Sequence, residues 1–199
     1  MKLVLYSKPD NGIIEKLENE IFHEKGTVFG YMPADGNSPK PQYTPFWQDL
    51  AKKHNAKFVY IDNSKTPTKA DLDKNSEINS LAVMGGNVFN LLHNIRTNGY
   101  NKIIRKLAEK EDFIYSGFSA GAIIATPNIR IANKEYCWAF GYDENEPNIT
   151  DTKALGFVDF EILPHFDPEL DRINLCKYKN KFETKVEPLT DSNYKIINI

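Results

Sequence analysis

The strongest restriction on the fold comes from a serine that stands between two glycines. Residues 117–121 read Gly-Phe-Ser-Ala-Gly, which fits the pattern G-x-S-x-G. An apolar, strand-forming run precedes them at 113–115, and small residues that can begin a helix follow at 120–122. This order predicts a tight strand-to-helix turn, with glycines where the two backbones approach too closely for a Cβ. Ser119 would then lie at a helix N-terminus, where free N–H groups stabilise an oxyanion, so it is a candidate nucleophile. A structural Gly-Ser turn is the alternative.

Strand-like and helical segments alternate along the first 120 residues. Strands are predicted at 2–6, 27–32, 57–61, 81–84 and 113–115, and helices at 11–24, 46–55, 88–95 and 102–110. This alternation predicts a three-layer α/β sandwich with a mostly parallel central sheet and right-handed crossovers.

The last third of the chain has a different pattern. Short strands are predicted at 129–132 and 136–140, a polar loop at 143–152, a strand at 157–163 and a helix at 168–182. Residues 185–189 and 194–199 are expected to form a closing hairpin.

Length and charge restrict the class of protein. The 199 residues, 41% of them hydrophobic, can bury one core, so we expect a single domain over residues 1–199. A net charge of −2 gives no reason to expect a nucleic-acid partner. No apolar run reaches membrane-spanning length and no signal peptide is visible, which favours a cytoplasmic protein without membrane contact. Cys137 and Cys176 lack metal or disulfide spacing, so we expect neither a disulfide, a metal nor a cofactor.

Three features fall at the carboxyl ends of predicted strands, where α/β sheets bind ligands. They are the Gly85-Gly86-Asn87 run, Ser119, and His165 between Pro164 and Phe166. A serine hydroxyl needs an adjacent base to become nucleophilic. Of the four histidines, His165 is the candidate, because the others fall on predicted helices: His23, His54 and His93.

A carboxylate should orient that histidine, and the residues alone leave its identity open. The downstream candidates are Asp167, Glu169, Glu183, Glu187 and Asp191. Asp167 lies only two positions from His165, and Asp191 is also explained as a turn residue. The N–H groups of Ala120 and Gly86 are candidate oxyanion donors. The glycine run is also compatible with a simple turn or a phosphate loop, although no phosphate-binding pattern is present.

Four segments in order resemble the aspartyl dipeptidase (peptidase E) and cyanophycinase family of serine peptidases. Residues 81–92 resemble its strand, glycine and Asn-Thr-Phe segment, and residues 117–122 its Gly-Trp-Ser-Ala-Gly-Ala turn. Residues 126–130 are similar to its Pro-Thr-Ile-Arg, and residues 160–166 to its strand ending in Asn-Pro-His-Phe. The resemblance covers nearly the whole chain.

The resemblance implies a glutamine amidotransferase-like fold and a Ser-His-Glu triad. Ser119 would be the nucleophile and His165 the base, and Asp191 would stand where the family has its glutamate. Gly86 and Ala120 would donate to the oxyanion. Contacts with substrate are expected from Gly85, Asn87 and Arg172.

Three departures bear on specificity. Met84 replaces the first residue of a triple glycine, Lys134 replaces an aspartate, and residues 167–171 are acidic where the family has a basic stretch. We therefore expect a serine peptidase of short peptides that is not restricted to N-terminal aspartate, acting as a monomer or homodimer. A peptide-binding homologue with little or no activity, and a hydrolase of non-peptide amides or esters, are the alternatives.

Overall fold

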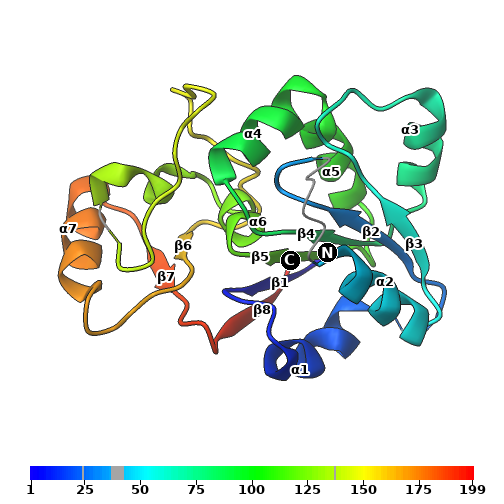
Figure 1. The fold of residues 1–199 in the computed structure, drawn as a ribbon, viewed down its shortest axis with the longest axis horizontal. Coiled ribbons are helices and arrows are strands. Elements are labelled where there is room, and N and C mark those ends of the chain that lie inside the picture. Colours follow the sequence, from blue (N-terminus) through cyan, green and yellow to red (C-terminus); the bar gives the residue numbers. More distant parts are fainter. Residues whose placement is uncertain (24, 37–42, 137) are drawn as a thin grey trace.

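The computed structural model describes residues 1–23, 25–36, 43–136 and 138–199 (Figure 1). The strands are β1 (Lys2–Tyr6), β2 (Val28–Met32), β3 (Lys57–Tyr60), β4 (Ser80–Val83), β5 (Ile114–Phe118), β6 (Glu161–Leu163), β7 (Val186–Pro188) and β8 (Tyr194–Asn198). The helices are α1 (Asn11–Ile21), α2 (Thr44–Lys53), α3 (Lys69–Ser76), α4 (Val88–Thr97), α5 (Tyr100–Ala108), α6 (Ala120–Ile124) and α7 (Arg172–Phe182).

Six of the strands form one sheet in the order β3-β2-β4-β5-β1-β8. All pairs in it are parallel except β1 with β8, which is antiparallel. The predicted α/β fold with a mostly parallel sheet is therefore confirmed. Because parallel strands end at the same edge, the segments that follow β1, β4 and β5 meet there.

Helices cover both faces of this sheet (Figure 1). Apolar side chains of α1 and α2 pack on one face with residues such as Val4, Phe29 and Ala82. Those of α4, α5 and α6 pack on the other face with residues such as Leu5 and Leu81. The alternation of side chains along each strand sends neighbouring residues to opposite cores. No helix in the described part of the chain is long and apolar enough to cross a membrane.

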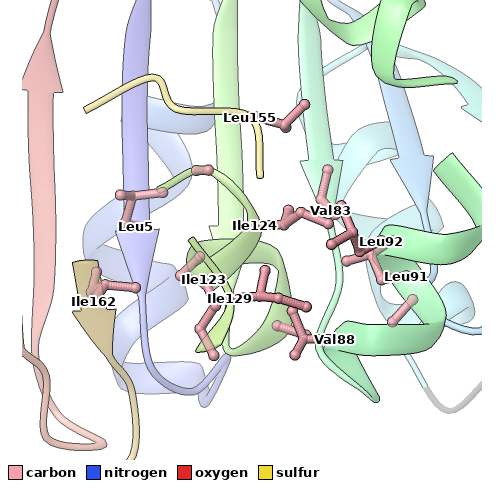
Figure 2. Packing of buried hydrophobic residues seen from close by; sticks show 14 of the residues in the cluster. Leu5, Val83, Val88, Leu91, Leu92, Ile123, Ile124, Ile129, Leu155 and Ile162 are labelled. Carbon is pink, nitrogen blue, oxygen red and sulfur yellow. The ribbon is translucent and has the colours of Figure 1, made fainter. Parts of the chain in front are cut away.

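The hydrophobic core between the sheet and helices α4, α5 and α6 includes the helix that directly follows the glycine-flanked serine. Figure 2 shows Ile123 and Ile124 of α6 packed among side chains of the sheet and of α4. Both are buried, as are Val83 and Leu92. The short helix that begins after Ser119 is thus fixed by apolar packing, because burying each such side chain contributes about 1.5–3 kcal/mol.

The hairpin predicted at the end of the chain is wrong. β7 pairs in parallel with β6 in a separate two-stranded sheet, and β8 pairs with β1 as the edge of the main sheet. Alternating residues in both runs correctly indicated strands, but that pattern carries no information on which strand is the partner. The turn between the two strands therefore connects two sheets.

Other boundaries in the last third also differ from the prediction. Residues 129–132 and the described residues of 136–140, which exclude 137, are not strands. The chain forms 3₁₀ turns at Arg130–Ala132 and Lys134–Tyr136, with Trp138 in a single bridge. Short apolar runs fit either structure, and here their side chains fill the core beside α7. β6 begins only at Glu161, and α7 begins only at Arg172. The helix α3 was missed, although a capping box of Thr68 and Asp71 marks its start.

Candidate active site

Ser119 lies in a sharp turn between β5 and α6. Its backbone has φ 50° and ψ −115°, a strained conformation for a residue other than glycine. A Cβ on Gly117 would come within 2.4 Å of the Gly121 oxygen, and one on Gly121 within 2.0 Å of the Val83 oxygen. Both flanking glycines are therefore required by close backbone packing. The Ser119 N–H donates to the carbonyl oxygen of Tyr6 at 3.1 Å, which ties the turn to the end of β1.

His165 follows β6 and faces this serine. Its Nε2 lies 3.0 Å from Ser119 Oγ. The His165 backbone has φ 57°, in the left-handed region, which costs a residue with a Cβ about 1–3 kcal/mol. The strand that carries it is anchored at the buried carboxylate of Glu161, which both Arg130 and Tyr178 bond. The Ile-Arg segment that helped to identify the resemblance thus supports the histidine strand.

Asp191 completes a chain of hydrogen-bonded side chains. The pairing of β6 with β7 continues past both strands: the Leu189 N–H donates to Leu163 at 2.8 Å, and the Phe166 N–H donates to Leu189 at 3.0 Å. This ladder places Asp191 beside the histidine, with Asp191 Oδ1 2.6 Å from His165 Nδ1. Of the other four predicted carboxylates, none is among the partners of the His165 ring in the described residues.

The surroundings of Asp191 favour its ionised form. Partial burial raises the pKa of this carboxyl, but hydrogen bonds from His165 and Ser7 more than offset it, and the net pKa lies below the ordinary value of 3.8. An ionised carboxylate can only accept hydrogen bonds, so Nδ1 carries the ring proton and Nε2 is left to accept from the serine hydroxyl.

The two predicted oxyanion donors lie at the starts of two helices. Ala120 is the first residue of α6, and Gly86 directly precedes Asn87, the N-cap of α4. The N–H of Ala120, as the first of its helix, has no partner within that helix. Gly86 has φ 146°, and a Cβ there would meet Ala34 at 2.8 Å, so the glycine is needed.

The other predicted substrate residues have different surroundings. Gly85 packs against Phe118, whose ring would lie 2.4 Å from a Cβ at that position. The Asn87 side chain accepts from the Asn90 N–H at 3.0 Å and donates to the Glu144 oxygen at 2.7 Å, so the fold uses both ends of its amide. Arg172 is exposed at the start of α7 and does not line the cavity beside Ser119.

A small cavity of about 60 Å³ opens beside Ser119 and His165. Its apolar wall includes Ile123, Ile131, Ala132, Trp138 and Leu163, and its polar groups include Asp143. The ring of Phe140 stacks on the imidazole of His165 with centroids 3.9 Å apart, although 71% of Phe140 is exposed. A larger hollow of about 700 Å³ lies between β3 and α3, but it contains neither the serine nor the histidine.

Negative charge collects at this end of the sheet. Asp143 accepts from the Val88 N–H at 2.8 Å, and burial and the charge of Asp35 raise its pKa. Burial and the charge of Glu146 likewise raise the pKa of Asp35. Lys134, which replaces the family's aspartate, lies exposed on a 3₁₀ turn. Arg172, the cation predicted to bind a substrate carboxylate, is not among the residues that line the cavity.

Three residues of the site went unnoticed in the sequence. Ser7 bonds both His165 and Asp191, Phe140 covers the imidazole, and Asp143 lines the cavity. Only Ser7 had a detectable signal, since it directly follows a predicted strand. No three His, Cys, Asp or Glu side chains in the described ranges gather in a way that could hold a metal ion. Cys176 is a free, exposed thiol on α7, and Cys137 lies outside the described residues.

Comparison with known sequences points to one family. The chain matches the sequence model of peptidase family S51 over residues 8–193. An uncharacterized peptidase from Listeria monocytogenes is 37% identical over 86 residues, which cover 43% of this chain and 38% of that protein. An uncharacterized peptidase from Pasteurella multocida is 33% identical over 106 residues, which cover 53% of this chain and 48% of that protein. These matches span less than half of each relative's own length.

Two crystal structures share the fold. One is a protein from Listeria monocytogenes EGD-e described as a candidate peptidase E, with a TM-score of 0.69 and 22% identity over 100% of this chain and 98% of that chain. The other is a peptidase from an acI-B1 Actinobacterium, with a TM-score of 0.68 and 14% identity over 99% of this chain and 83% of that chain. At these identities the likeness establishes the fold alone.

Proposed function

This chain belongs to peptidase family S51, and we propose that it is a serine peptidase that cleaves short peptides through an acyl-enzyme on Ser119. One observation carries the proposal: Ser119 Oγ, the His165 ring and Asp191 Oδ1 are joined at 3.0 and 2.6 Å, although they come from three distant segments. A nucleophile, a base and an orienting carboxylate in this order are the requirements of acyl transfer.

The proposed reaction begins when the Ser119 oxygen attacks the peptide carbonyl and its proton passes to His165 Nε2. Asp191 stabilises the imidazolium that forms. The N–H groups of Gly86 and Ala120 bind the oxyanion, and His165 then protonates the leaving amine. Water, deprotonated by His165, hydrolyses the ester on Ser119 and restores the enzyme.

The charges around the cavity bear on the substrate. Asp143 lines it, and Asp35 adds negative charge nearby, whereas the exposed Arg172 lies outside it. An acidic side chain would be repelled there, since like charges at short range raise the cost of burial. A free substrate ammonium would be attracted. We therefore propose peptides with neutral or basic N-terminal residues as substrates, in preference to N-terminal aspartate.

A dipeptide library with acidic, neutral and basic N-terminal residues tests this function. Wild type should cleave neutral and basic members, and Ser119→Ala should lose the activity. The control is Ser76→Ala, an exposed serine at the end of α3 whose hydroxyl donates to the Asp73 oxygen. Hydrolysis that survives in Ser119→Ala would refute the mechanism. Cleavage of esters but of no peptide would instead assign the same site to a non-peptide substrate.

Covalent labelling provides a second test. A fluorophosphonate should modify Ser119 in wild type, identified by peptide mass spectrometry, and label His165→Gln far more slowly, because the hydroxyl then lacks its base. The absence of an adduct on Ser119 in folded wild type would favour a binding protein without chemistry.

A further inference from the structure

Ser7 is a buried serine that contacts both partners of the candidate nucleophile. It follows β1 directly and has 0% exposure. Its Oγ accepts the backbone N–H of His165 at 2.6 Å and donates to Asp191 Oδ1 at 3.0 Å. The same oxygen lies 3.3 Å from His165 Nδ1. One hydroxyl therefore touches the histidine backbone, the histidine ring and the carboxylate.

We propose that Ser7 is a positioning residue, which fixes both the backbone of His165 and the position of the proton on its imidazole ring. The proposal rests on the proposed function, in which His165 must accept a proton at Nε2. Ser7 itself touches neither the substrate nor the reacting oxygen, so it acts through its two neighbours.

The backbone contact supports the first part. His165 adopts a positive φ of 57°, which a residue with a Cβ keeps only when its surroundings enforce it. The Ser7 oxygen provides an acceptor for the N–H of this residue, which would otherwise lie unpaired in a partly buried turn. Without that acceptor the turn can relax, and a small shift of the ring would lengthen its contact with Ser119.

Counting donors supports the second part. A hydroxyl has one proton, and Asp191, when ionised, can only accept. With the Ser7 proton directed to Asp191 Oδ1, Ser7 does not donate to Nδ1, and Nδ1 keeps the ring proton that faces the same carboxylate oxygen at 2.6 Å. Nε2 is then free to accept from Ser119. The opposite arrangement, with Ser7 donating to Nδ1, would place the ring proton on Nε2 and disable the base.

The end of β1 also holds the nucleophile. The Tyr6 oxygen accepts the Ser119 N–H at 3.1 Å, and Ser7 is the next residue. Two consecutive residues thus hold the serine turn and the histidine turn. Both turns are therefore bonded to the same end of β1. This common attachment keeps the distance between Ser119 Oγ and His165 Nε2 constant, as proton transfer between them requires.

The first test compares Ser7→Ala with Ser80→Ala. Ser80 is equally buried, and its hydroxyl donates to the Ile21 oxygen, at the opposite end of its strand from the site. We expect similar losses of thermal stability in both variants. In Ser7→Ala alone, kcat should fall about 10- to 100-fold with KM nearly unchanged, because positioning acts on the transition state. Equal kcat values in the two variants would overturn the proposal.

The second test is a double-mutant cycle with Asp191→Ala. Removing Asp191 frees the Ser7 proton to donate to Nδ1, so Ser7 then holds the wrong ring tautomer. Adding Ser7→Ala to Asp191→Ala should therefore change kcat by less than about 2-fold, or raise it, instead of repeating the loss seen in wild type. Losses that simply multiply would show that Ser7 does not act through the ring.

A third measurement is independent of any substrate. The ring ¹⁵N resonances of His165, identified by their absence in His165→Gln, report which nitrogen carries the proton. We expect Nδ1–H in wild type and Ser80→Ala. In Ser7→Ala the His165 turn loses the acceptor of its N–H, so the ring should shift away from Asp191 and part of the population should carry the proton on Nε2. If wild type cleaves no peptide but this change appears, the proposed function fails and the positioning role stands. An unchanged ring spectrum in folded Ser7→Ala would overturn the role.

Discussion

The backbone of Gly121 rests on the carbonyl group of Val83 so closely that a Cβ on Gly121 would lie 2.0 Å from the Val83 oxygen. The helix that begins after Ser119 is therefore seated on the end of β4, and β4 leads directly to Gly86. The two proposed oxyanion donors, on Ala120 and Gly86, thus have a fixed relation to each other. They are set by backbone contact, which allows less adjustment than contact between side chains.

Gly121→Ala should damage both stability and activity. The added methyl group must displace backbone, so we expect a loss of about 1–3 kcal/mol in the free energy of unfolding, with a fall in kcat from the displaced helix start. Gly12→Ala in α1 is the matched control, because its Cβ would meet only Asp10 Oδ1 at an ordinary 3.7 Å. Urea unfolding of both variants decides the point. Equal stability of the two would contradict the close contact.

The pKa of Asp191 predicts a dependence of stability on pH. Burial raises this pKa, but hydrogen bonds from His165 and Ser7 lower it by more, and the net value lies below 3.8. A lowered folded-state pKa gives stability that is complete above the unfolded value and is lost as pH falls through the folded value. The stability difference between wild type and Asp191→Asn should therefore shrink below about pH 4, as followed by urea unfolding. A difference that stays constant down to about pH 2 would speak against it.

Asp143 should show the opposite sign. Burial and the charge of Asp35 raise its pKa above 3.8, so its ionised form opposes folding. Stability is then complete below the unfolded value and is lost as pH rises through the folded value. Asp143→Asn keeps an oxygen for the Val88 N–H, so it should be more stable than wild type at pH 7 and equal to it below about pH 4.

The same substitution bears on specificity. Removing this charge should raise KM for dipeptides with a basic N-terminal residue relative to those with a neutral one. A preference unchanged in Asp143→Asn would assign substrate selection to other residues.

Phe140→Ala should weaken catalysis without weakening the fold. The ring stacks on His165 at a centroid distance of 3.9 Å but is largely exposed, so its loss removes little buried area. A stacked aromatic pair contributes about 0.5–1.5 kcal/mol, which corresponds to a fall in kcat/KM of roughly 2- to 10-fold. Tyr142→Ala, an exposed aromatic on the same cavity rim without the stacking contact, is the control. An equal effect of both variants would show that the stacking contact is unimportant.

Local patterns were sufficient to predict much of the fold. The strands of the parallel sheet were recognisable as apolar runs. The turn at Ser119 was recognisable from its two glycines, which are needed because the neighbouring backbones pack too closely for a Cβ. The predicted strand after residue 156 was too long because residues 157–160 form bends beside the core, where apolar side chains do not need a ladder. A buried strand and a buried irregular segment thus have the same apolar sequence pattern.

Relations between distant segments could not be predicted in this way. Ser7 lies 158 positions from His165. Its place directly after a predicted strand puts it at the ligand-binding edge of the sheet, but does not indicate that its hydroxyl reaches the histidine. The partner of Asp191 likewise depends on β7 pairing with β6, whereas the turn pattern around it suggested a hairpin. These contacts depend on which strands pair with each other, and the residue pattern of a single strand does not specify its partner.

The two-stranded sheet of β6 and β7 has a mechanical consequence. His165 and Asp191 are attached to it, while Ser119 belongs to the main sheet, so the base and the nucleophile sit on separate supports. The alignment of His165 with Ser119 therefore depends on how the two sheets are packed against each other. The ion pair between Arg130 and the buried carboxylate of Glu161 helps to hold β6 in place, although it touches none of the three residues. Weakening this ion pair would let β6 move relative to the main sheet. The distance between Ser119 and His165 would then change, although all three residues of the site are intact.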